Sequence, residues 1–459
     1  MLTRSRRVIG KKLLVSRGGI PSTGLQFYAD LWNYGQQDFL LSFDGNDFGS
    51  YTVANFRSAD SSGAAEGWVR SSSTANNQTL IASSDTATDF SRWIIYVAQT
   101  TGRLTISTQD AAGTTNTVSG TTNVCDGKWV HWKVNSSGTA WDVDFNGVAE
   151  TLIVVAGTNT GDWLADVTLR DNLTIGARTA TSTGNYAIGE IGFTRIYSRT
   201  MATAEALTNY QRGRKATASD TTGLVFNLPL TEGTGNPADT IIPATITLTG
   251  ATWVEGLMDR STNALAMTSF GSPTWGNTGR TFDGTGNQYI QIDNALVALD
   301  NLWDGGGSFV IWFTPSAITT IHGLWGKGTN TYLWLRGSSG AGQIQLGQAF
   351  SGGNATWRTS ASGLLVNDTP VMLTVLYNAD AAANDPTIYL NLTQQSIGTD
   401  LNSSGTRTTD AGTNTLLAKE QGNFALNGIL HEIWRWNPKT LTLAELTQVY
   451  NTTKWRHSL

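Results

Sequence analysis

A long-range internal repeat limits what this chain can fold into more than any other feature of its sequence. The strings LSFDGNDFGSYTV, from Leu41, and RTFDGTGNQYIQI, from Arg280, both place Phe-Asp-Gly before an alternating run. Phe43 and Phe282 are 239 residues apart. Other matching strings follow in the same order in both halves. This indicates a duplicated structural unit rather than one repeated motif.

The two copies define the expected domains. Copy one opens with GLQFYAD at Gly24 and copy two with GLVFNLP at Gly223, and matching closing strings contain Gly189 and Gly428, again 239 residues apart. Copy two also has a long lead-in, residues 230–281, without an equally long counterpart in copy one. A polar stretch of small residues between the copies is typical of a linker. We therefore predict a basic arm over 1–22, a first domain over 23–214, a linker over 215–222 and a second domain over 223–459.

Composition and local patterns predict strands rather than helices. Charged residues make up only 14% of the chain, and 50 of the 459 residues are Gly, which favours strands joined by tight turns. Apolar residues alternate in runs such as WVHWKV, from Trp129, as in half-buried strands. Each copy closes with a short helix. Thr442 and Glu445 predict a capping box in copy two, whereas Ala202 in copy one should weaken the helix start by about 1 kcal/mol.

Charge and cysteine content restrict the partners and the compartment. The net charge of −5 gives no general attraction to nucleic acid or to an anionic membrane, and no apolar run is long enough to span a bilayer. The single cysteine, Cys125, excludes an intrachain disulfide framework. We expect synthesis in a reducing cytosol without export by the usual route. The candidate particle-anchoring residues are the cations of the N-terminal arm: Arg4, Arg6, Arg7, Lys11, Lys12 and Arg17.

These strings together resemble a known family. GLVFNLPLTEGTGN, TLTGATWVEG, FDGTGNQYIQI, SFVIWFTPSA and NGILHEIWRWNPKTLTLAEL are similar to laminin-G-like, concanavalin A-like lectin/glucanase domains. The resemblance implies an all-β fold of two tandem antiparallel jelly-roll sandwiches. It covers residues 223–455 well and residues 24–214 more loosely. Such a resemblance identifies fold rather than activity.

Enzymatic activity is not expected. Glucanases that share this fold place their catalytic carboxylates on one strand with Glu-x-Asp-x-(x-)Glu spacing, and retaining hydrolysis needs the two carboxyl groups about 5–5.5 Å apart. The chain has nine Glu, of which the closest pair, Glu420 and Glu432, is twelve residues apart. Its four histidines have no metal-binding spacing, and His131 in WVHWKV is predicted to be a hydrogen-bonded strand histidine.

The first Phe-Asp-Gly string also suggests a candidate cation loop. Asp44, Asn46 and Asp47 lie close together in FDGND, and calcium prefers such oxygen ligands. The second string keeps only Asp283 and Asn287. Because both copies preserve Asp-Gly but only one keeps the extra acids, we favour a structural turn over a calcium site near Asp44 and Asp47.

Tryptophans outside the repeated strings are the candidate glycan-binding residues, since sugars stack on aromatic faces flanked by polar groups. The candidates are Trp93, Trp334 and Trp357, with Arg336 and Arg358 close by in sequence. The alternative for each tryptophan is a packed core position.

These observations favour a virion component, because similar domains are displayed on tailed bacteriophages. We predict a non-enzymatic virion structural protein, such as a capsid decoration, head fibre or tail component, assembled in the host cytoplasm. Its N-terminal part would anchor it to other virion proteins, it would self-associate, and host-surface glycans are candidate ligands. The alternatives are a secreted or cell-surface carbohydrate-binding protein and, less favoured, a glycoside hydrolase. No cofactor is predicted.

Overall fold

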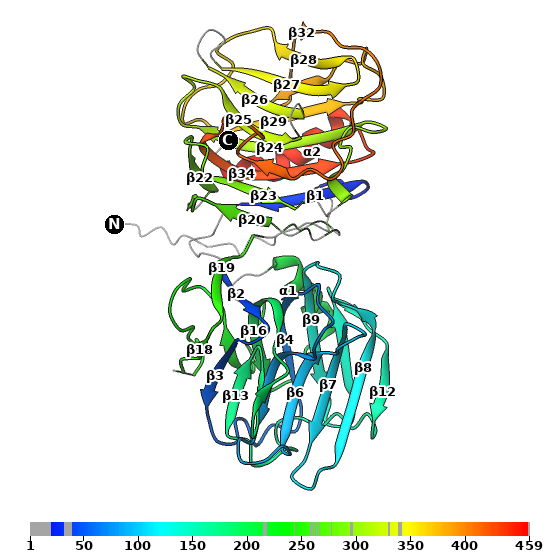
Figure 1. Ribbon diagram of the computed structural model, residues 1–459, viewed down its shortest axis with the longest axis vertical. Coiled ribbons are helices and arrows are strands. Elements are labelled where there is room, and N and C mark those ends of the chain that lie inside the picture. Colours follow the sequence, from blue (N-terminus) through cyan, green and yellow to red (C-terminus); the bar gives the residue numbers. More distant parts are fainter. Residues whose placement is uncertain are drawn as a thin grey trace, which may run out of the picture.

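Two antiparallel β-sandwiches make up the protein, drawn one above the other in Figure 1. The computed structural model describes residues 20–31, 39–213, 218–242, 244–257, 259, 261, 263, 265, 267–276, 278–293, 297–328, 331–337 and 342–457. Each sandwich packs two eight-stranded sheets face to face. We call the sheet that carries an α-helix on its outer face the helix-side sheet, and the other the far sheet. The predicted all-β class is confirmed.

The first sandwich contains most of the N-terminal half. Its helix-side sheet runs in the order β11 (Val148–Ala149), β10 (Trp141–Phe145), β9 (Val130–Ser136), β4 (Gly63–Arg70), β16 (Ile188–Tyr197), β2 (Phe39–Asp44) and β19 (Thr252–Glu255), with β17 (Leu224–Leu228) also beside β16. Its far sheet runs in the order β12 (Leu152–Ala156), β8 (Thr115–Asn123), β7 (Arg103–Gln109), β6 (Arg92–Val97), β5 (Gln78–Ser84), β13 (Asn172–Ile175), β3 (Phe48–Thr52) and β18 (Thr247–Thr249). The remaining elements are the hairpin β14 (Arg178–Thr179) and β15 (Thr183–Gly184) and the helix α1 (Thr203–Arg212).

The second sandwich repeats this plan. Its helix-side sheet runs in the order β31 (Thr393–Gln395), β30 (Thr387–Leu390), β29 (Val371–Tyr377), β24 (Gly307–Pro315), β34 (Asn427–Trp436), β22 (Arg280–Asp283) and β21 (Thr274–Trp275), with β1 (Leu25–Asp30) also beside β34. Its far sheet runs in the order β32 (Ile397–Leu401), β28 (Gly353–Thr359), β27 (Gln343–Phe350), β26 (Thr331–Arg336), β25 (His322–Lys327), β33 (Thr415–Leu417), β23 (Tyr289–Ile292) and β20 (Met267–Phe270). The helical elements are η1 (Val297–Leu299), α2 (Leu443–Thr453) and η3 (Lys454–His457).

Central strands of the helix-side sheets are apolar on both faces because both faces are covered. In β24, Ile311 and Phe313 face the core between the sheets, whereas Val310 and Trp312 pack with residues of α2. The ring of Trp312 stacks on Tyr450 of α2 at a centroid separation of 5.7 Å. A strand buried on both faces loses the apolar–polar alternation, which explains the continuous run SFVIWF.

Strand pairing exchanges the opening strands of the two copies. The N-terminal strand β1 pairs with β34 of the second sandwich, from Leu25 opposite Trp436 to Asp30 opposite Glu432. Conversely, β17, β18 and β19 follow α1 in the chain but pair with β16, β3 and β2 of the first sandwich. The first sandwich is therefore inserted between β1 and the rest of the second, and the tandem boundaries 23–214 and 223–459 place these four strands in the wrong sandwich.

The exchange also accounts for the long lead-in of copy two. Residues 230–281 contain an opening strand pair for each sandwich: β18 and β19 for the first, and β20 and β21 for the second. The two pairs occupy equivalent places in their sheets and lie in similar strings, TLTGATW and TSFGSPTW. Each sandwich thereby receives a complete set of strands, although the first obtains part of its set from the C-terminal side.

The predicted turns and helix starts are confirmed. Phe43 lies opposite Gly189 and Phe282 opposite Gly428, so both Phe-Asp-Gly strings occupy the same place beside the closing strand. Helix α2 begins with the capping box of Thr442 and Glu445. Helix α1 has no side-chain cap at Ala202, as expected.

Two predicted segments differ from expectation or lie outside the described residues. Of the linker 215–222, residues 218–222 are described and belong to the first sandwich, since Ser219 N–H donates to Asn209 Oδ1 over 2.9 Å. Arg4, Arg6, Arg7, Lys11, Lys12 and Arg17 of the arm lie outside the described residues. Just after the arm, Pro21 C=O accepts a 2.7 Å hydrogen bond from Trp436 Nε1, so the chain enters the fold at the second sandwich, not the first.

The strand exchange predicts that a mutation near the N-terminus destabilises the C-terminal sandwich. Tyr28 is buried and stacks on Trp434 at 5.1 Å. We expect Tyr28→Ala to lower the free energy of unfolding of the second sandwich by about 3–5 kcal/mol, as for other buried aromatics. Hydrogen–deuterium exchange should rise in peptides of β34 and stay unchanged in β16.

The matched variant is Leu228→Ala, because Leu228 of β17 lies opposite Thr194 in β16 as Tyr28 lies opposite Trp434 in β34. It should raise exchange in β16 and leave β34 protected. A Tyr28→Ala protein with faster exchange in β16 alone would contradict the exchanged topology.

Candidate functional site

Two of the three tryptophans predicted to bind glycans are core residues. Trp93 on β6 is fully buried and packs edge-on against Trp163 at 5.0 Å. Trp357 on β28 is 1% exposed, and its Nε1 donates to Asp385 over 2.7 Å. Both side chains face the space between the sheets, so neither presents a ring face to a ligand, and the alternative of a packed tryptophan holds for these two.

Trp334 is different because it lies on the outer face of the far sheet in the second sandwich. Its neighbours on β26, Leu333 and Leu335, are buried in the core, which directs Trp334 to the opposite face. Its ring stacks on Tyr332 at 3.8 Å and meets Phe424 edge-on at 5.2 Å. Trp334 is half-buried and Phe424 is 37% exposed. We call Tyr332, Trp334 and Phe424 the aromatic face.

Three glycines allow these rings to lie close to the sheet. Gly347 of β27 lies opposite Tyr332, and a Cβ there would come within 2.3 Å of the Tyr332 ring. On β25, a Cβ at Gly323 would meet the Phe424 carbonyl oxygen at 2.5 Å, and one at Gly326 would meet the Glu420 backbone at 2.6 Å. The loop that carries Phe424 can therefore rest directly on β25, which brings its ring to Trp334.

Two polar atoms at the aromatic face have no hydrogen-bond partner among the described residues. Gln345 lies directly opposite Trp334, is 6% exposed, and makes a long 3.4 Å contact from Nε2 to Tyr332 Oη. Its Oε1 is buried and unpartnered, as is Nε1 of Trp334. Both atoms are buried, so a ligand at this surface would be held by the exposed parts of the rings and not by these two atoms.

The predicted arginines lie at the border of this surface. Arg358 of β28 is opposite Gln345 and forms a 2.9 Å ion pair with Asp400. Arg336 is two residues beyond Trp334 on β26, which places it on the same face of the strand. Trp334, Arg336 and Arg358 are thus brought together. Burial raises the pKa of Tyr332, so its hydroxyl stays neutral at physiological pH.

The candidate cation loop contains turn hydrogen bonds. Asp47 Oδ2 accepts from the Asp44 N–H over 2.9 Å, and Asp44 Oδ1 accepts from the Asn46 N–H over 3.3 Å. In copy two, Asp283 Oδ1 accepts from the Thr285 N–H over 3.0 Å. Among the described residues, no group of three or more His, Cys, Asp or Glu side chains is arranged to hold a metal ion. The geometry supports the turn that both copies share.

Three sets of neighbouring carboxylates are bridged by cations. Lys133 Nζ contacts Asp142 Oδ1 at 2.6 Å and Asp144 Oδ2 at 3.0 Å. The same arrangement recurs at Arg199 with Glu205 and Asp220, and at Lys327 with Asp300 and Asp410. In each trio the cation pairs with both carboxylates, so the ion pairs tie neighbouring elements of the fold together.

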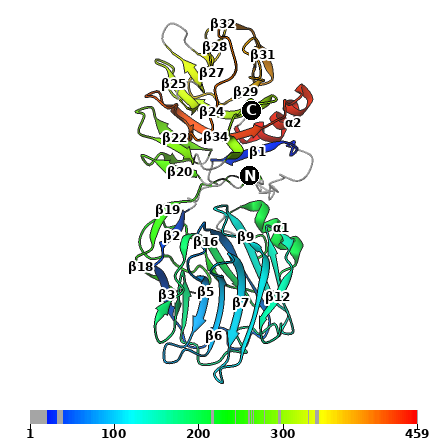
Figure 2. The same cartoon turned by 45° about the vertical axis from the view of Figure 1, so that its right-hand side comes forward.

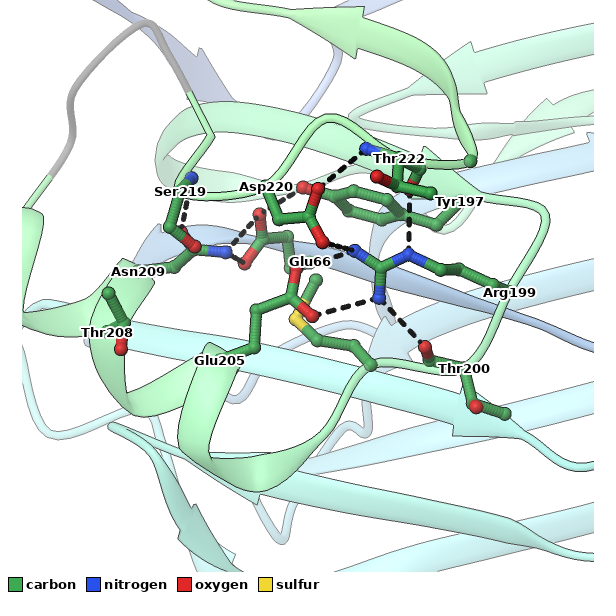
Figure 3. A network of polar contacts seen from close by, with 12 residues as sticks. Glu66, Tyr197, Arg199, Thr200, Glu205, Thr208, Asn209, Ser219, Asp220 and Thr222 are labelled. Carbon is green, nitrogen blue, oxygen red and sulfur yellow. Dashed lines mark hydrogen bonds and ion pairs between the residues drawn. The ribbon is translucent and has the colours of Figure 1, made fainter.

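The most heavily bonded carboxylate of the first sandwich is buried beneath α1. Glu66 on β4 is fully buried and contacts Arg195 Nη1 at 3.0 Å, Tyr197 Oη at 3.0 Å, Asn209 Nδ2 at 3.0 Å and His131 Nε2 at 3.1 Å. Figure 3 shows Tyr197 and Asn209 converging on it. His131 is thus the hydrogen-bonded strand histidine that the sequence predicted. Burial alone would raise the pKa of Glu66, but the His131 hydrogen bond and the Arg195 charge outweigh it and hold the pKa at about 2.

A second ion cluster in Figure 3 fixes the start of α1. Arg199 makes two 2.8 Å bonds to the carboxylate of Glu205 and one of 3.1 Å to Asp220. Glu205 lies in the first turn of α1, where Ala202 provides no cap. In the second sandwich, Lys439 pairs with Glu445 beside the capping box. The bidentate arginine thus holds the helix start that lacks a cap.

Comparisons with known proteins agree with this all-β architecture. Residues 44–206 match the family model described as the Concanavalin A-like lectin/glucanases superfamily, which covers the body of the first sandwich but not β17–β19. No curated protein sequence matches the chain. No helix in the described part of the chain is long and apolar enough to cross a membrane.

Solved structures give weak similarities over their full lengths. Domains LG4-5 of the mouse laminin alpha1 chain share 11% identity over 93% of this chain and 92% of that one, with a TM-score of 0.30. The CBM40 domain of the Ruminococcus gnavus IT-sialidase, solved bound to alpha2,3 sialyllactose, shares 13% identity over 36% of this chain and 95% of that one, with a TM-score of 0.31. A SAP-like pentraxin from Limulus polyphemus shares 14% identity over 49% and 94%, with a TM-score of 0.31.

The Glu66 cluster predicts a specific acid sensitivity of the first sandwich. The pKa of Glu66 is about 2 in the folded protein, below its ordinary value of 4.5. The charged Glu66 therefore stabilises the first sandwich fully above pH 4.5, and this stabilisation is lost as the pH falls toward 2. We expect Glu66→Gln to lower the free energy of unfolding by about 3–5 kcal/mol at pH 7. In urea titrations, the difference in free energy of unfolding between Glu66→Gln and the wild type should become smaller as the pH approaches 2.

Glu205→Gln is the matched control, since the Arg199–Glu205 pair is partly exposed and such pairs contribute about 0–1 kcal/mol. If the two variants lost the same free energy of unfolding at pH 7, the buried Glu66 would contribute no more to stability than the partly exposed Glu205.

Proposed function

We propose that this protein is a non-catalytic glycan-binding protein and that the aromatic face of the second sandwich is its ligand site. The single observation that carries the proposal is the ring of Trp334 on the outer face of the far sheet, flanked by Tyr332 and Phe424 and bordered by Arg336 and Arg358. A sugar ring offers an apolar C–H face for stacking and hydroxyl groups that both donate and accept. It therefore fits a surface that combines aromatic rings with nearby guanidinium groups, those of Arg336 and Arg358.

The equivalent face of the first sandwich lacks this combination. Its far sheet carries hydroxyl side chains that bond to each other: Thr105 Oγ1 donates to Ser119 Oγ over 3.0 Å, and Ser107 and Thr117 share a 2.8 Å bond. On β6, Tyr96 is the one aromatic residue on that face, since Trp93 faces the core. The proposal is therefore restricted to the second sandwich.

Glycan binding should depend on Trp334. We expect Trp334→Ala to weaken binding of the full chain to its best ligand in a panel of neutral and acidic oligosaccharides by at least about tenfold, which corresponds to about 1.4 kcal/mol. Isothermal titration calorimetry with that ligand measures the loss. Trp455→Ala is the control, because Trp455 is 40% exposed but lies on η3, after α2, which covers the other sheet. Equal affinities of the Trp334→Ala and Trp455→Ala proteins would refute the site.

The finer predictions of a virion role stay proposals. They comprise a virion structural protein assembled in the host cytoplasm, attachment to other virion proteins through the basic arm, and recognition of host-surface glycans. Because the chain enters at the second sandwich, an attached arm would hold the sandwich that carries the aromatic face. In Figure 1, β1 lies on the side of that sandwich that faces the first sandwich.

A further inference from the structure

One sheet edge of the first sandwich is unusually apolar. Strand β12 is the last strand of the far sheet and pairs only with β8, so one side of its backbone is open among the described residues. Three consecutive β-branched side chains on it are exposed: Ile153 by 41%, Val154 by 55% and Val155 by 60%. Val148, on the neighbouring edge strand β11, is 67% exposed. Figures 1 and 2 both show β12 at the rim of the sandwich.

No charge protects this edge. Residues 152–161 contain no Asp, Glu, Lys or Arg. The nearest acid, Glu150, is engaged elsewhere: its Oε1 accepts from the N–H groups of Thr121 and Thr122 over 2.6 and 2.9 Å, and both hydroxyls donate to the same carboxylate. Burial opposes this charge, but the bonds from Thr121 and Thr122 outweigh it and lower the pKa of Glu150. The open strand is therefore an uncharged strip on a chain of net charge −5.

The other edges of the two far sheets are polar or charged. β32 occupies the same place in the second sandwich as β12 in the first, and it carries Gly398 and Asp400, which is paired with Arg358. The opposite edges, β18 and β20, carry exposed threonines, Thr247 and Thr268 among them.

Natural sheets usually blunt their edges with charges, bulges or very short strands, because an open apolar edge pairs with another strand. β12 has a bulge between Val154 and Ala156 in its pairing with β8, but it keeps three exposed apolar side chains and no charge. Among the edges of the far sheets it is therefore the one best suited to a partner strand.

We infer that β12 pairs with β12 of a second copy of this chain to form a homodimer. An antiparallel pair about a two-fold axis at Val154, just before the bulge of β12, places Val154 opposite itself and Ile153 of one copy beside Val155 of the other, so the strip is complementary to itself. Two copies of an acidic chain repel each other least where neither carries charge. The pairing joins two eight-stranded far sheets into one continuous sheet and leaves the aromatic face of each copy free.

Charge placed on the strip should abolish the dimer. In sedimentation equilibrium of the full chain, we expect the wild type to approach twice the 49.2 kDa of the monomer as its concentration rises. Val154→Lys should remain monomeric at every concentration, since the lysine is solvent-exposed in the monomer but opposes its own copy in the pair. The matched control is Leu401→Lys on β32, where Leu401 is 51% exposed, and it should dimerise like the wild type. A monomeric wild type at several hundred micromolar, or a dimeric Val154→Lys protein, would overturn the inference.

A second variant tests the register directly. In the two-fold pair, Cβ atoms of directly opposed residues lie about 4.5–5.5 Å apart, within reach of a disulfide after small adjustment. Val154→Cys should therefore form a covalent dimer under mild oxidation, whereas Leu401→Cys should not. The native Cys125 is buried and should not interfere. Failure of Val154→Cys to crosslink faster than Leu401→Cys would exclude β12 as the interface, even if the protein dimerises through another surface.

Discussion

The hydrogen-bonded pairing of β1 with β34 is the interaction on which the architecture depends. It closes the helix-side sheet of the second sandwich beside its long closing strand. It also contributes Phe27 and Ala29 to the core between the sheets and Tyr28 to the layer beneath α2. The whole first sandwich lies between β1 and the rest of its sheet. Loop-closure entropy rises only by about 0.6 kcal/mol for each doubling of loop length, so an insertion of this size is compatible with a stable pairing.

The two sandwiches share a topology, but an equivalent position on their closing strands, β16 and β34, carries different side chains. In the first, Arg195 on the closing strand lies opposite Glu66, and the pair is buried within a complete set of hydrogen bonds. In the second, the equivalent residue is Trp434, which lies opposite Val310 and stacks on Tyr28 at 5.1 Å. At this position the first sandwich thus has a buried ion pair where the second has stacked aromatic rings.

Local features were predictable from the sequence because they depend on neighbouring residues. The turns at Asp44 and Asp283 and the cap at Thr442 follow from side chains that bond to nearby backbone. The strand exchange was not predictable in the same way. The strings GLQFYAD and GLVFNLP suit the same strand position beside a closing strand, and no neighbouring residue indicates which sandwich each strand joins. The aromatic face was partly visible: Tyr332, Trp334 and Arg336 alternate along one strand, but Gln345 and Phe424 reach it only through strand pairing and a loop.

The register between β2 and β19 has a consequence for how such chains can be assembled. Phe39, where the first sandwich begins, lies directly opposite Glu255, where it ends. Its two ends are therefore as close as two opposed residues of antiparallel strands, about 5 Å apart. A folded unit whose ends are adjacent can be inserted into another domain at a single point without distorting that domain. This is the geometric condition for domain insertion. The first sandwich is thus a self-contained unit that another sandwich with adjacent ends could replace while β1 and β34 remain paired.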